Sequence, residues 1–314
     1  MSAGLALATA RHIVRRGGEA TFAIPPAFAG HSEGFRRWMV VGEDTPAVHT
    51  GFGMCTLEAR GLVASHLHSF EETFHILEGE VELATGEGVF LLRPGDYGLV
   101  PVGVAHSWLG LATGGTRWAE MMAPQPRARL GYDTFFPGGG DRGPEARDRS
   151  PAISIDVRDP RTRSFGHIEP SNMDVDRQTQ DQLAISASMR TALLVYSGIT
   201  VKMMVDSDLG AQLSTMFMVQ YQPNGMAGQH DHPIEETYLI LDGEVDATFD
   251  GQRYRMTPGD VGFAGVGCVH GFSNPADTPV RWLETQAPQP PARHSYRFAR
   301  DWDYLQSRIA EKRS

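Results

Sequence analysis

The 314-residue sequence contains only two cysteines, Cys55 and Cys268, which is too few for a framework of disulfide bonds. Reduced thiols in a cytosolic setting are the simplest interpretation. Positive charge is also in short supply, because 28 lysines and arginines face 38 aspartates and glutamates, giving a net charge of −10. Nucleic acids and anionic membranes attract basic surfaces, so we expect neither as a partner.

Long apolar runs are missing as well, and none approaches the ~20 residues that a helix needs to cross a bilayer. The sequence starts with small and apolar residues, but the charges of Arg11, Arg15 and Arg16 follow them, whereas a secretory signal has its charges first. The sequence therefore predicts a cytoplasmic protein.

Sustained helical periodicity is scarce in the first half of the chain. Short alternating or apolar segments dominate instead, and turns such as Glu78-Gly79 and Pro94-Gly95 separate them. Many short strands with glycine and proline between them are typical of a β-sandwich or β-barrel. We therefore predict an all-β fold.

The chain repeats itself with a constant offset of 164 residues; the Ala-Pro-Gln-Pro run at 123–126, for example, recurs at 287–290. A repeat of this length indicates two copies of a domain. A stretch rich in glycine, proline and mixed charge lies between the copies and is typical of a linker. The predicted divisions are an N-terminal arm (1–35), a first domain (36–136), a linker (137–194), a second domain (195–298) and a short C-terminal helix (299–314).

One pattern of histidines and a glutamate occurs once in each half. The candidate metal ligands are His66, His68, Glu72 and His106 in the first half and His230, His232, Glu236 and His270 in the second. Histidines two residues apart on a strand point to the same side. Three imidazoles and one carboxylate suit a divalent first-row metal ion and leave coordination positions open for substrate, water or dioxygen. Because the set is duplicated at fixed spacing, we prefer this interpretation to polar residues satisfied within a core.

These residues resemble the motifs of the cupin superfamily. The first family motif has a glycine seven positions after the glutamate, and Gly79 and Gly243 match it. In the second motif, Gly110 replaces an asparagine in the first copy and Gly265 replaces a proline in the second, which leaves the ligand sets intact. The resemblance covers both predicted domains. It implies two tandem cupin jelly-roll β-barrels, a bicupin, with one divalent metal ion per domain.

The two predicted sites differ beside their ligands, since the second copy has Tyr238 where the first has Phe74. A hydroxyl beside a metal ion can orient a substrate oxygen or move a proton. We therefore predict Glu236 and Tyr238 as catalytic, together with Glu72, and favour the second site as the more active one. Cys268 is interpreted as a small buried apolar residue rather than a reactive thiol.

Other charged residues near the motifs have less specific interpretations. Glu120 and Glu284 could line the cavities, but an exposed or interdomain position is preferred for both. Arg36, Arg37 and Lys202 could anchor an anionic substrate, although solvated surface charges are the preferred interpretation. By parity along its strand, His75 should face away from the metal.

Three functions are consistent with the resemblance. The first is a dioxygenase that cleaves a C–C bond of a small enolic or phenolic substrate, as in quercetin dioxygenase-like bicupins, with iron(II) preferred over manganese, nickel or zinc. The second is non-redox Lewis-acid chemistry, as in ureidoglycine aminohydrolase-like bicupins, oxalate decarboxylase-like enzymes or isomerases. The third is a non-catalytic cupin that binds a small molecule. The sequence identifies neither the substrate nor the oligomeric state; a homo-oligomer is suggested by analogy alone.

Overall fold

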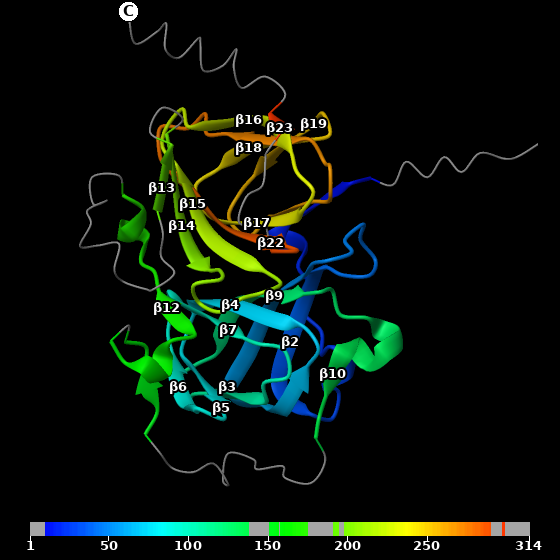
Figure 1. The fold of residues 1–314 in the computed structure, drawn as a ribbon, viewed down its shortest axis with the longest axis vertical. Helices are drawn as coiled ribbons and strands as arrows, with labels where there is room; N and C mark the ends of the chain where they lie inside the picture. The colour runs from blue at the N-terminus through cyan, green and yellow to red at the C-terminus, as the bar shows by residue number, and fades with distance from the viewer. Residues whose placement is uncertain are drawn as a thin grey trace, which may run out of the picture.

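The computed structural model describes residues 10–137, 151–156, 158–174, 191–194, 198–289 and 297–298. Two curled β-barrels lie one above the other (Figure 1), which confirms the predicted all-β fold with two tandem barrels. The predicted C-terminal helix (299–314) lies outside the described residues. No helix in the described part of the chain has the length and apolar character needed to span a bilayer.

The first barrel is organised around its longest strand. Its elements are β2 (Ser32–Val41), β3 (Gly51–His68), β4 (Glu71–Glu78), β5 (Val81–Thr85), β6 (Gly88–Leu92), β7 (Asp96–Val100), β8 (His106–Gly110), β9 (Thr116–Ala123), η3 (Ala128–Asp133) and β10 (Thr134–Phe135). The first half of β3 pairs with β9 and its second half pairs with β8, so the strand contributes to both faces of the barrel. β2 and β10 also pair with β3.

The second barrel repeats this arrangement. Its strands are β13 (Thr191–Leu194), β14 (Ile199–Val205), β15 (Thr215–Tyr221), β16 (Met226–Asp231), β17 (Glu235–Asp242), β18 (Val245–Phe249), β19 (Gln252–Met256), β20 (Val261–Ala264), β21 (His270–Ser273), β22 (Val280–Ala287) and β23 (Arg297–Phe298). One sheet contains β20-β17-β22-β15-β14-β13 and the other contains β19-β18-β21-β16-β23.

The N-terminal arm contacts both barrels. It contains β1 (His12–Arg15), η1 (Gly17–Glu19) and η2 (Pro26–Phe28). β1 pairs antiparallel with β20, and Arg11 and Arg16 donate hydrogen bonds to Asp250 and Asp260 of the second barrel. Farther along, Phe28 is buried in the core of the first barrel. The arm therefore links an edge of the second barrel to the interior of the first.

Part of the predicted linker packs on the first barrel. Its described elements are β11 (Ile153–Ser154), η5 (Pro160–Thr162), β12 (Phe165–His167) and η6 (Pro170–Met173). β11 pairs with β6 and β12 pairs with β7, and Phe165 joins the apolar core of the first barrel. These segments therefore extend the first sheet.

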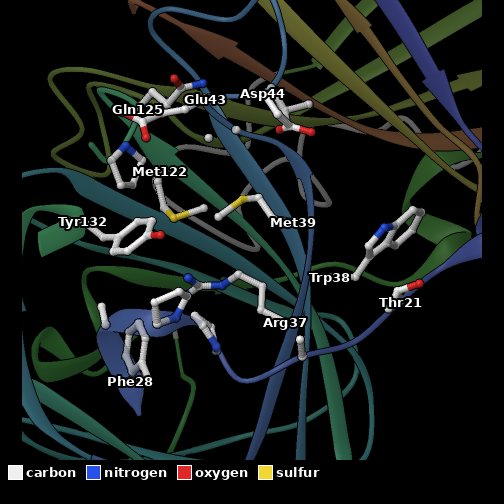
Figure 2. A pocket seen from close by; sticks show the side chains of 18 of the residues that line it. Thr21, Phe28, Arg37, Trp38, Met39, Glu43, Asp44, Met122, Gln125 and Tyr132 are labelled. Carbon is white, nitrogen blue, oxygen red and sulfur yellow. The ribbon is translucent and has the colours of Figure 1, made fainter. Parts of the chain in front are cut away.

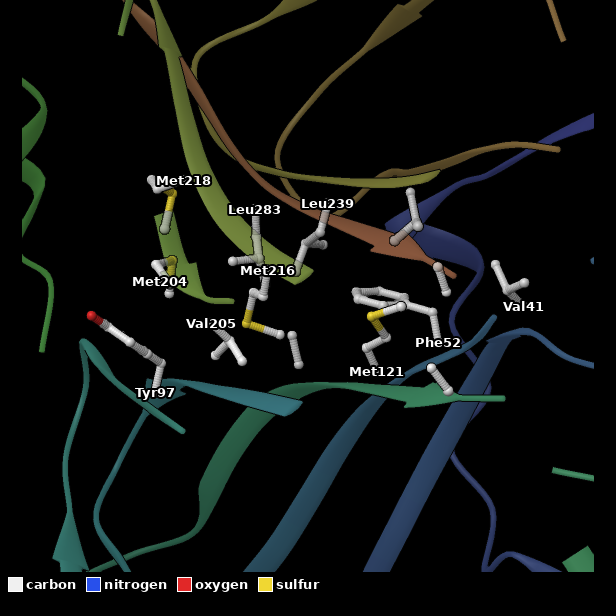
Figure 3. Close-up of a cluster of buried hydrophobic side chains, with 14 of the residues drawn as sticks. Val41, Phe52, Tyr97, Met121, Met204, Val205, Met216, Met218, Leu239 and Leu283 are labelled. Carbon is white, nitrogen blue, oxygen red and sulfur yellow. The ribbon is translucent and has the colours of Figure 1, made fainter. Parts of the chain in front are cut away.

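A large apolar cluster lies between the barrels, and both halves contribute to it (Figure 3). Side chains alternate along β9, so that Trp118 points into its own barrel while Met121 points towards the other one. β22 repeats the pattern with Trp282 and Leu283. Removal of this apolar surface from water is the main force that holds the two barrels together.

Two buried glutamates bind loops of the opposite barrel. Glu71 accepts hydrogen bonds from three backbone N–H groups of residues 212–214 at 2.6–3.2 Å. Glu235 accepts three from residues 48–50 at 2.7–2.9 Å. Each of these glutamates directly precedes a predicted metal ligand, so the interdomain contacts begin one residue from each candidate site.

Candidate metal centres

Three strands bring the four predicted ligands of the first half together. His66 and His68 lie at the end of β3, Glu72 lies near the start of β4, and His106 begins β8 directly opposite His66. The Nε2 atoms of His68 and His106 lie 3.1 and 3.3 Å from one carboxylate oxygen of Glu72. The rings of His66 and His106 have centroids 4.1 Å apart, and all four side chains are buried.

The second half repeats this geometry on β16, β17 and β21. His230 pairs with His270 across the strands, with ring centroids 4.3 Å apart. The Nε2 atoms of His232 and His270 lie 2.9 and 3.2 Å from one oxygen of Glu236. Thus the structure brings all eight predicted ligands into two clusters of four.

The same backbone contact orients all six histidines, because each Nδ1 lies 2.6–3.0 Å from the carbonyl oxygen of a residue two positions away. The pairs are His66 with Ala64, His68 with Phe70, His106 with Val104, His230 with Gly228, His232 with Ile234, and His270 with Cys268. A carbonyl oxygen only accepts, so Nδ1 carries the proton and the Nε2 lone pair of the neutral ring points into the cluster. Hydrogen bonds of this kind orient metal-binding histidines.

The donor set fits a divalent metal ion. The ligand atoms of His66, Glu72 and His106 lie within 4.8 Å of one another, as do those of His230, His232 and His270. The buried Nε2 atoms of His106 and His270 have no hydrogen-bond partner among the described residues. Buried polar atoms without a partner are rare, and a shared ion would satisfy these. Imidazole and carboxylate ligands suit iron, manganese, nickel and zinc.

Local electrostatics favour the protonation states that metal binding requires at four of these groups, Glu72, Glu236, His66 and His230. At His232, burial alone would lower the pKa, but contact with Glu236 raises it overall. Burial alone would raise the pKa values of Glu72 and Glu236, but the histidine rings in contact with each carboxylate hold both pKa values well below the ordinary range. Burial, followed by the nearby His106 ring, lowers the pKa of His66 well below its usual value. Burial also lowers the pKa of His230 to about 4. Charged carboxylates and neutral imidazoles are the forms that bind metal ions.

The second centre has two polar neighbours that the first lacks. The Tyr238 hydroxyl and the Gln286 amide donate hydrogen bonds to the two oxygens of Glu236. Burial, and then the charge of Glu236, raises the pKa of Tyr238 well above its usual value. Tyr238 therefore stays protonated and orients the carboxylate. The first half has Phe74 and Met122 at the equivalent positions, and neither can donate a hydrogen bond.

Glu120 lies inside the first barrel, which corrects the expectation of an exposed or interdomain carboxylate. It accepts two hydrogen bonds from Nη2 of Arg37, at 2.6 and 2.8 Å, and one from Cys55 Sγ at 2.8 Å. The Arg37 side chain is only 8% exposed, so the expectation of a solvated surface charge is also wrong. Burial alone would lower the pKa of Arg37, but the carboxylate of Glu120 raises it overall, and the guanidinium stays charged.

Glu284 likewise points into its own barrel, where it accepts a hydrogen bond from Trp282 Nε1 at 2.9 Å. The second half has no counterpart of Arg37, since Val201 occupies the equivalent position. Burial, and then the charge of Glu236, raises the pKa of Glu284 well above its usual value. Lys202 is buried as well, so the interpretation of both residues as exposed charges is corrected.

Glu284→Gln is expected to change how stability depends on pH. Because its pKa is raised in the folded state, the Glu284 carboxyl favours folding when protonated, and this contribution disappears as the pH rises through the folded-state pKa. Metal-free wild-type protein should therefore lose stability relative to Glu284→Gln as the pH rises above 4.5, the ordinary pKa of the group. Urea unfolding at several pH values measures this difference, and equal pH slopes would contradict it.

Two further residues lie where parity along the strands places them. His75 is on the opposite side of β4 from Glu72 and faces the second barrel, and burial lowers its pKa to about 4. Cys268 belongs to the apolar core of the second barrel, where burial raises the pKa of its thiol to about 12. A thiol with this pKa stays protonated, as expected of a buried apolar residue.

A cavity of about 640 Å³ adjoins the first centre (Figure 2). Two of its wall residues contact ligand rings: Phe70 stacks on His68 with centroids 3.9 Å apart, and Phe28 lies 5.2 Å from His66. The rest of the wall combines apolar and aromatic residues, among them Trp38, Met39, Met122 and Tyr132, with charged ones. Arg37 is the buried cation, and Arg15, Arg16, Glu19, Glu43 and Asp44 are more exposed. None of the four predicted ligands is among the described residues that line this cavity, so it borders the first centre through Phe28 and Phe70.

The sequence interpretation assigned no role to Glu71, Glu235 or Gln286. Gln286 lies two residues beyond Glu284 on one strand, so its inward parity was a usable signal. The interdomain contacts of Glu71 and Glu235 join positions 141 to 187 residues apart, and no local sequence pattern predicts such contacts.

Comparison with known proteins agrees with this geometry. The family profile described as the cupin domain matches residues 53–120 and 217–285. A search of curated protein sequences gives no match. Among solved structures, Lactobacillus farciminis oxalate decarboxylase in complex with formate is similar, with 18% identity, a TM-score of 0.61 and coverage of 95% of this chain and 92% of the other.

Bacillus subtilis oxalate decarboxylase at pH 4.6 is a second similar structure, with 14% identity, a TM-score of 0.59 and coverage of 95% of this chain and 82% of the other. At this identity the likeness concerns the fold. The family match in each half, the paired barrels and the duplicated clusters lead to one conclusion. Each half of the chain contains one cupin domain, at residues 53–120 and 217–285, and the two together have the architecture of a bicupin.

Proposed function

We propose that this bicupin is a metal-dependent enzyme that acts on a small organic carboxylate at the first centre, by non-redox chemistry such as decarboxylation. The observation that supports this most strongly is the position of Arg37, a buried and charged residue in the wall of the cavity beside His66 and His68. The other charged residues of the wall are exposed or half-buried, so Arg37 is the cation at which water competes least with an anionic group of the ligand.

One edge of the Arg37 guanidinium remains for a ligand. Nη2 binds Glu120 and Nε points at Cys55 Sγ, whereas Nη1 donates no hydrogen bond to a described residue. The Phe28 ring lies 5.3 Å from the Arg37 guanidinium carbon and 5.2 Å from the His66 ring. A carboxylate bound to Nη1 would therefore lie close to the first centre, with charge-assisted hydrogen bonds fixing its orientation.

The metal ligands, Arg37 and the cavity wall have separate roles in this proposal. A divalent ion held by His66, His68, Glu72 and His106 would supply a Lewis acid that polarises a substrate oxygen. Arg37 binds and orients the carboxylate, and Glu120 holds Arg37 in place. The apolar side chains of the wall keep water away from the bound carboxylate, which strengthens its interaction with Arg37.

The comparisons favour the decarboxylase alternative over the dioxygenase interpretation, because the similar solved structures are named oxalate decarboxylases. Oxalate itself is small for a cavity of about 640 Å³, a volume within the ~300–1,000 Å³ of pockets for drug-sized ligands. We therefore propose a larger carboxylic acid with an apolar portion. Dioxygenase activity, and catalysis at the second centre by Glu236 and Tyr238, stay untested predictions.

The proposal is tested by assaying metal-loaded protein against oxalate and a panel of aliphatic and aromatic carboxylic acids, with and without oxygen. Carbon dioxide release that persists anaerobically is the expected result, because decarboxylation consumes no oxidant. Strict dependence on oxygen would favour the dioxygenase instead. Absence of turnover of every acid with each candidate metal would contradict a carboxylate substrate.

Arg37→Gln is expected to lower kcat/KM for the carboxylate substrate by roughly 10–100-fold, the value of one or two charge-assisted hydrogen bonds. Arg36→Gln is the matched control, because Arg36 precedes Arg37 on β2 and is exposed. Arg37→Lys keeps a positive charge beside Glu120, so it tests the role of the guanidinium in a variant whose buried charge pair is preserved. Equal activity of wild type and Arg37→Gln, at equal metal content, would refute the role of Arg37.

A further inference from the structure

We propose that the cleft between the two barrels is a second binding site, which takes a small anion with two acidic groups or a phosphate group. The cleft has a volume of about 700 Å³ and is lined by both barrels and by residues 167–170 of the connecting segment. Its strand residues come mainly from β4 and β17, with Arg117 of β9 and Arg281 of β22, and no predicted metal ligand is among its described lining residues. Clefts between domains are common ligand sites.

Two equivalent arginines, one from each barrel, line the cleft. Arg117 on β9 and Arg281 on β22 are related by the internal repeat of 164 residues. Their odd positions put them on the same strand faces as Met121 and Leu283, which form the apolar interface between the barrels. Each barrel therefore contributes one arginine, Arg117 or Arg281, to the cleft from the strand face that also forms the apolar interface.

These guanidinium groups are poorly satisfied by the described residues. The Arg281 side chain is only 17% exposed, makes no hydrogen bond to a described residue, and has its nearest carboxylate oxygen, on Asp242, 3.7 Å away. The Nε atom of Arg117 is buried and has no partner among the described residues, while its Nη1 donates a hydrogen bond of 3.3 Å to Glu78. Arg93 also lines the cleft and makes no ion pair with a described residue.

A nearly buried guanidinium without hydrogen bonds is costly unless something binds it. Glu78 and Glu169 also line the cleft, but Glu169 lies 3.6 Å from His167, whose other ring nitrogen binds Asp96. Three arginines and two glutamates line the cleft, and the charges of Asp242 and Asp174 also act on Arg281. The feature that would attract an anion is therefore the set of N–H groups without hydrogen bonds on Arg281, not an excess of positive charge. Guanidinium groups bind carboxylate and phosphate oxygens, so the free N–H groups of Arg281 and Nε of Arg117 suit a dicarboxylate or a phosphate ester.

The site is tested by calorimetric titration of the full-length, metal-loaded protein with inorganic phosphate and with succinate at constant ionic strength. Binding of either probe to wild type is expected, and Arg281→Gln should weaken it at least ~10-fold. Arg117→Gln should act in the same direction. Arg255→Gln is the matched control, because Arg255 is 54% exposed and binds Asp246 on the second barrel outside the cleft. The affinity of this variant for either probe should stay within about twofold of wild type.

The probe that binds more tightly identifies the class of anion, and either preference supports the site. Metal content and far-UV circular dichroism check that the variants fold. If Arg281→Gln does not fold, the binding measured for Arg117→Gln decides the test. Failure of both probes to bind at millimolar concentration would overturn the proposal. So would equal losses in Arg281→Gln and Arg255→Gln. Loss of binding in Arg37→Gln but not in Arg281→Gln would assign the anion to the cavity of the first centre instead.

Discussion

Replacing His66 by alanine should reduce the metal content from two ions per chain to one and abolish turnover of the carboxylate substrate. The imidazole supplies one of four ligands. Its Nδ1 donates a hydrogen bond to the Ala64 carbonyl, which leaves the lone pair of Nε2 for the ion. A Lewis acid contributes several kcal/mol to stabilisation of the transition state, so its loss corresponds to a rate decrease of roughly 10³–10⁴-fold. Metal analysis and steady-state kinetics on the same preparation measure both effects.

His230→Ala is the internal comparison for this prediction, because it removes the equivalent ligand from the second barrel. It should also leave one ion per chain, but turnover should stay within about threefold of wild type, since we place the reaction at the first centre. His49→Ala serves as a histidine control, because His49 contacts Glu235 through its backbone N–H rather than its ring. Loss of activity in His230→Ala with retention in His66→Ala would move the reaction to the second centre.

Glu71→Gln should destabilise the protein by about 2–4 kcal/mol. The carboxylate accepts three backbone N–H groups of residues 212–214 and the hydroxyl of Ser214, and the side chain is 3% exposed. Glutamine has nearly the same shape but turns one acceptor into a donor that faces other donors. The charge-assisted hydrogen bonds are lost and buried N–H groups are left without partners, so the cost exceeds that of one ordinary hydrogen bond.

Urea unfolding measures this difference as a lower transition midpoint, with an unchanged slope if the two barrels unfold together. Glu235→Gln should have a similar effect, because its carboxylate accepts three N–H groups from residues 48–50. Glu87→Gln, at an exposed turn, should change stability by no more than about 0.5 kcal/mol. If Glu71→Gln were as stable as Glu87→Gln, the reciprocal contacts would not hold the barrels together.

The internal repeat and the ligand motifs predicted most of the fold and both clusters. Strand parity alone places His66 and His68 on one face, and the equal spacing in both halves makes chance an unattractive explanation. Local periodicity is enough for such a prediction, because each motif residue lies on a strand whose two faces differ in burial. The all-β fold follows from the same local patterns, the two domains follow from the repeat, and the tandem jelly-roll barrels follow from the resemblance to the cupin superfamily.

Residues that act through distant partners were interpreted less well. Arg37 and Glu120 looked like surface charges because charged residues are mostly exposed, and only the pairing of β2, β3 and β9 shows that they neutralise each other inside the barrel. Glu71 contacts a loop 141 to 143 residues away in the sequence. Such contacts depend on how the two barrels pack, and no local pattern encodes that packing.

Anomalous X-ray diffraction from crystals of manganese-loaded protein tests the two-centre account most directly. The account predicts two strong anomalous peaks per chain, one within bonding distance of Nε2 of His66, His68 and His106 and of Glu72, and one in the equivalent place among His230, His232, Glu236 and His270. Peaks elsewhere, or histidines that turn Nδ1 rather than Nε2 towards the ion, would contradict it.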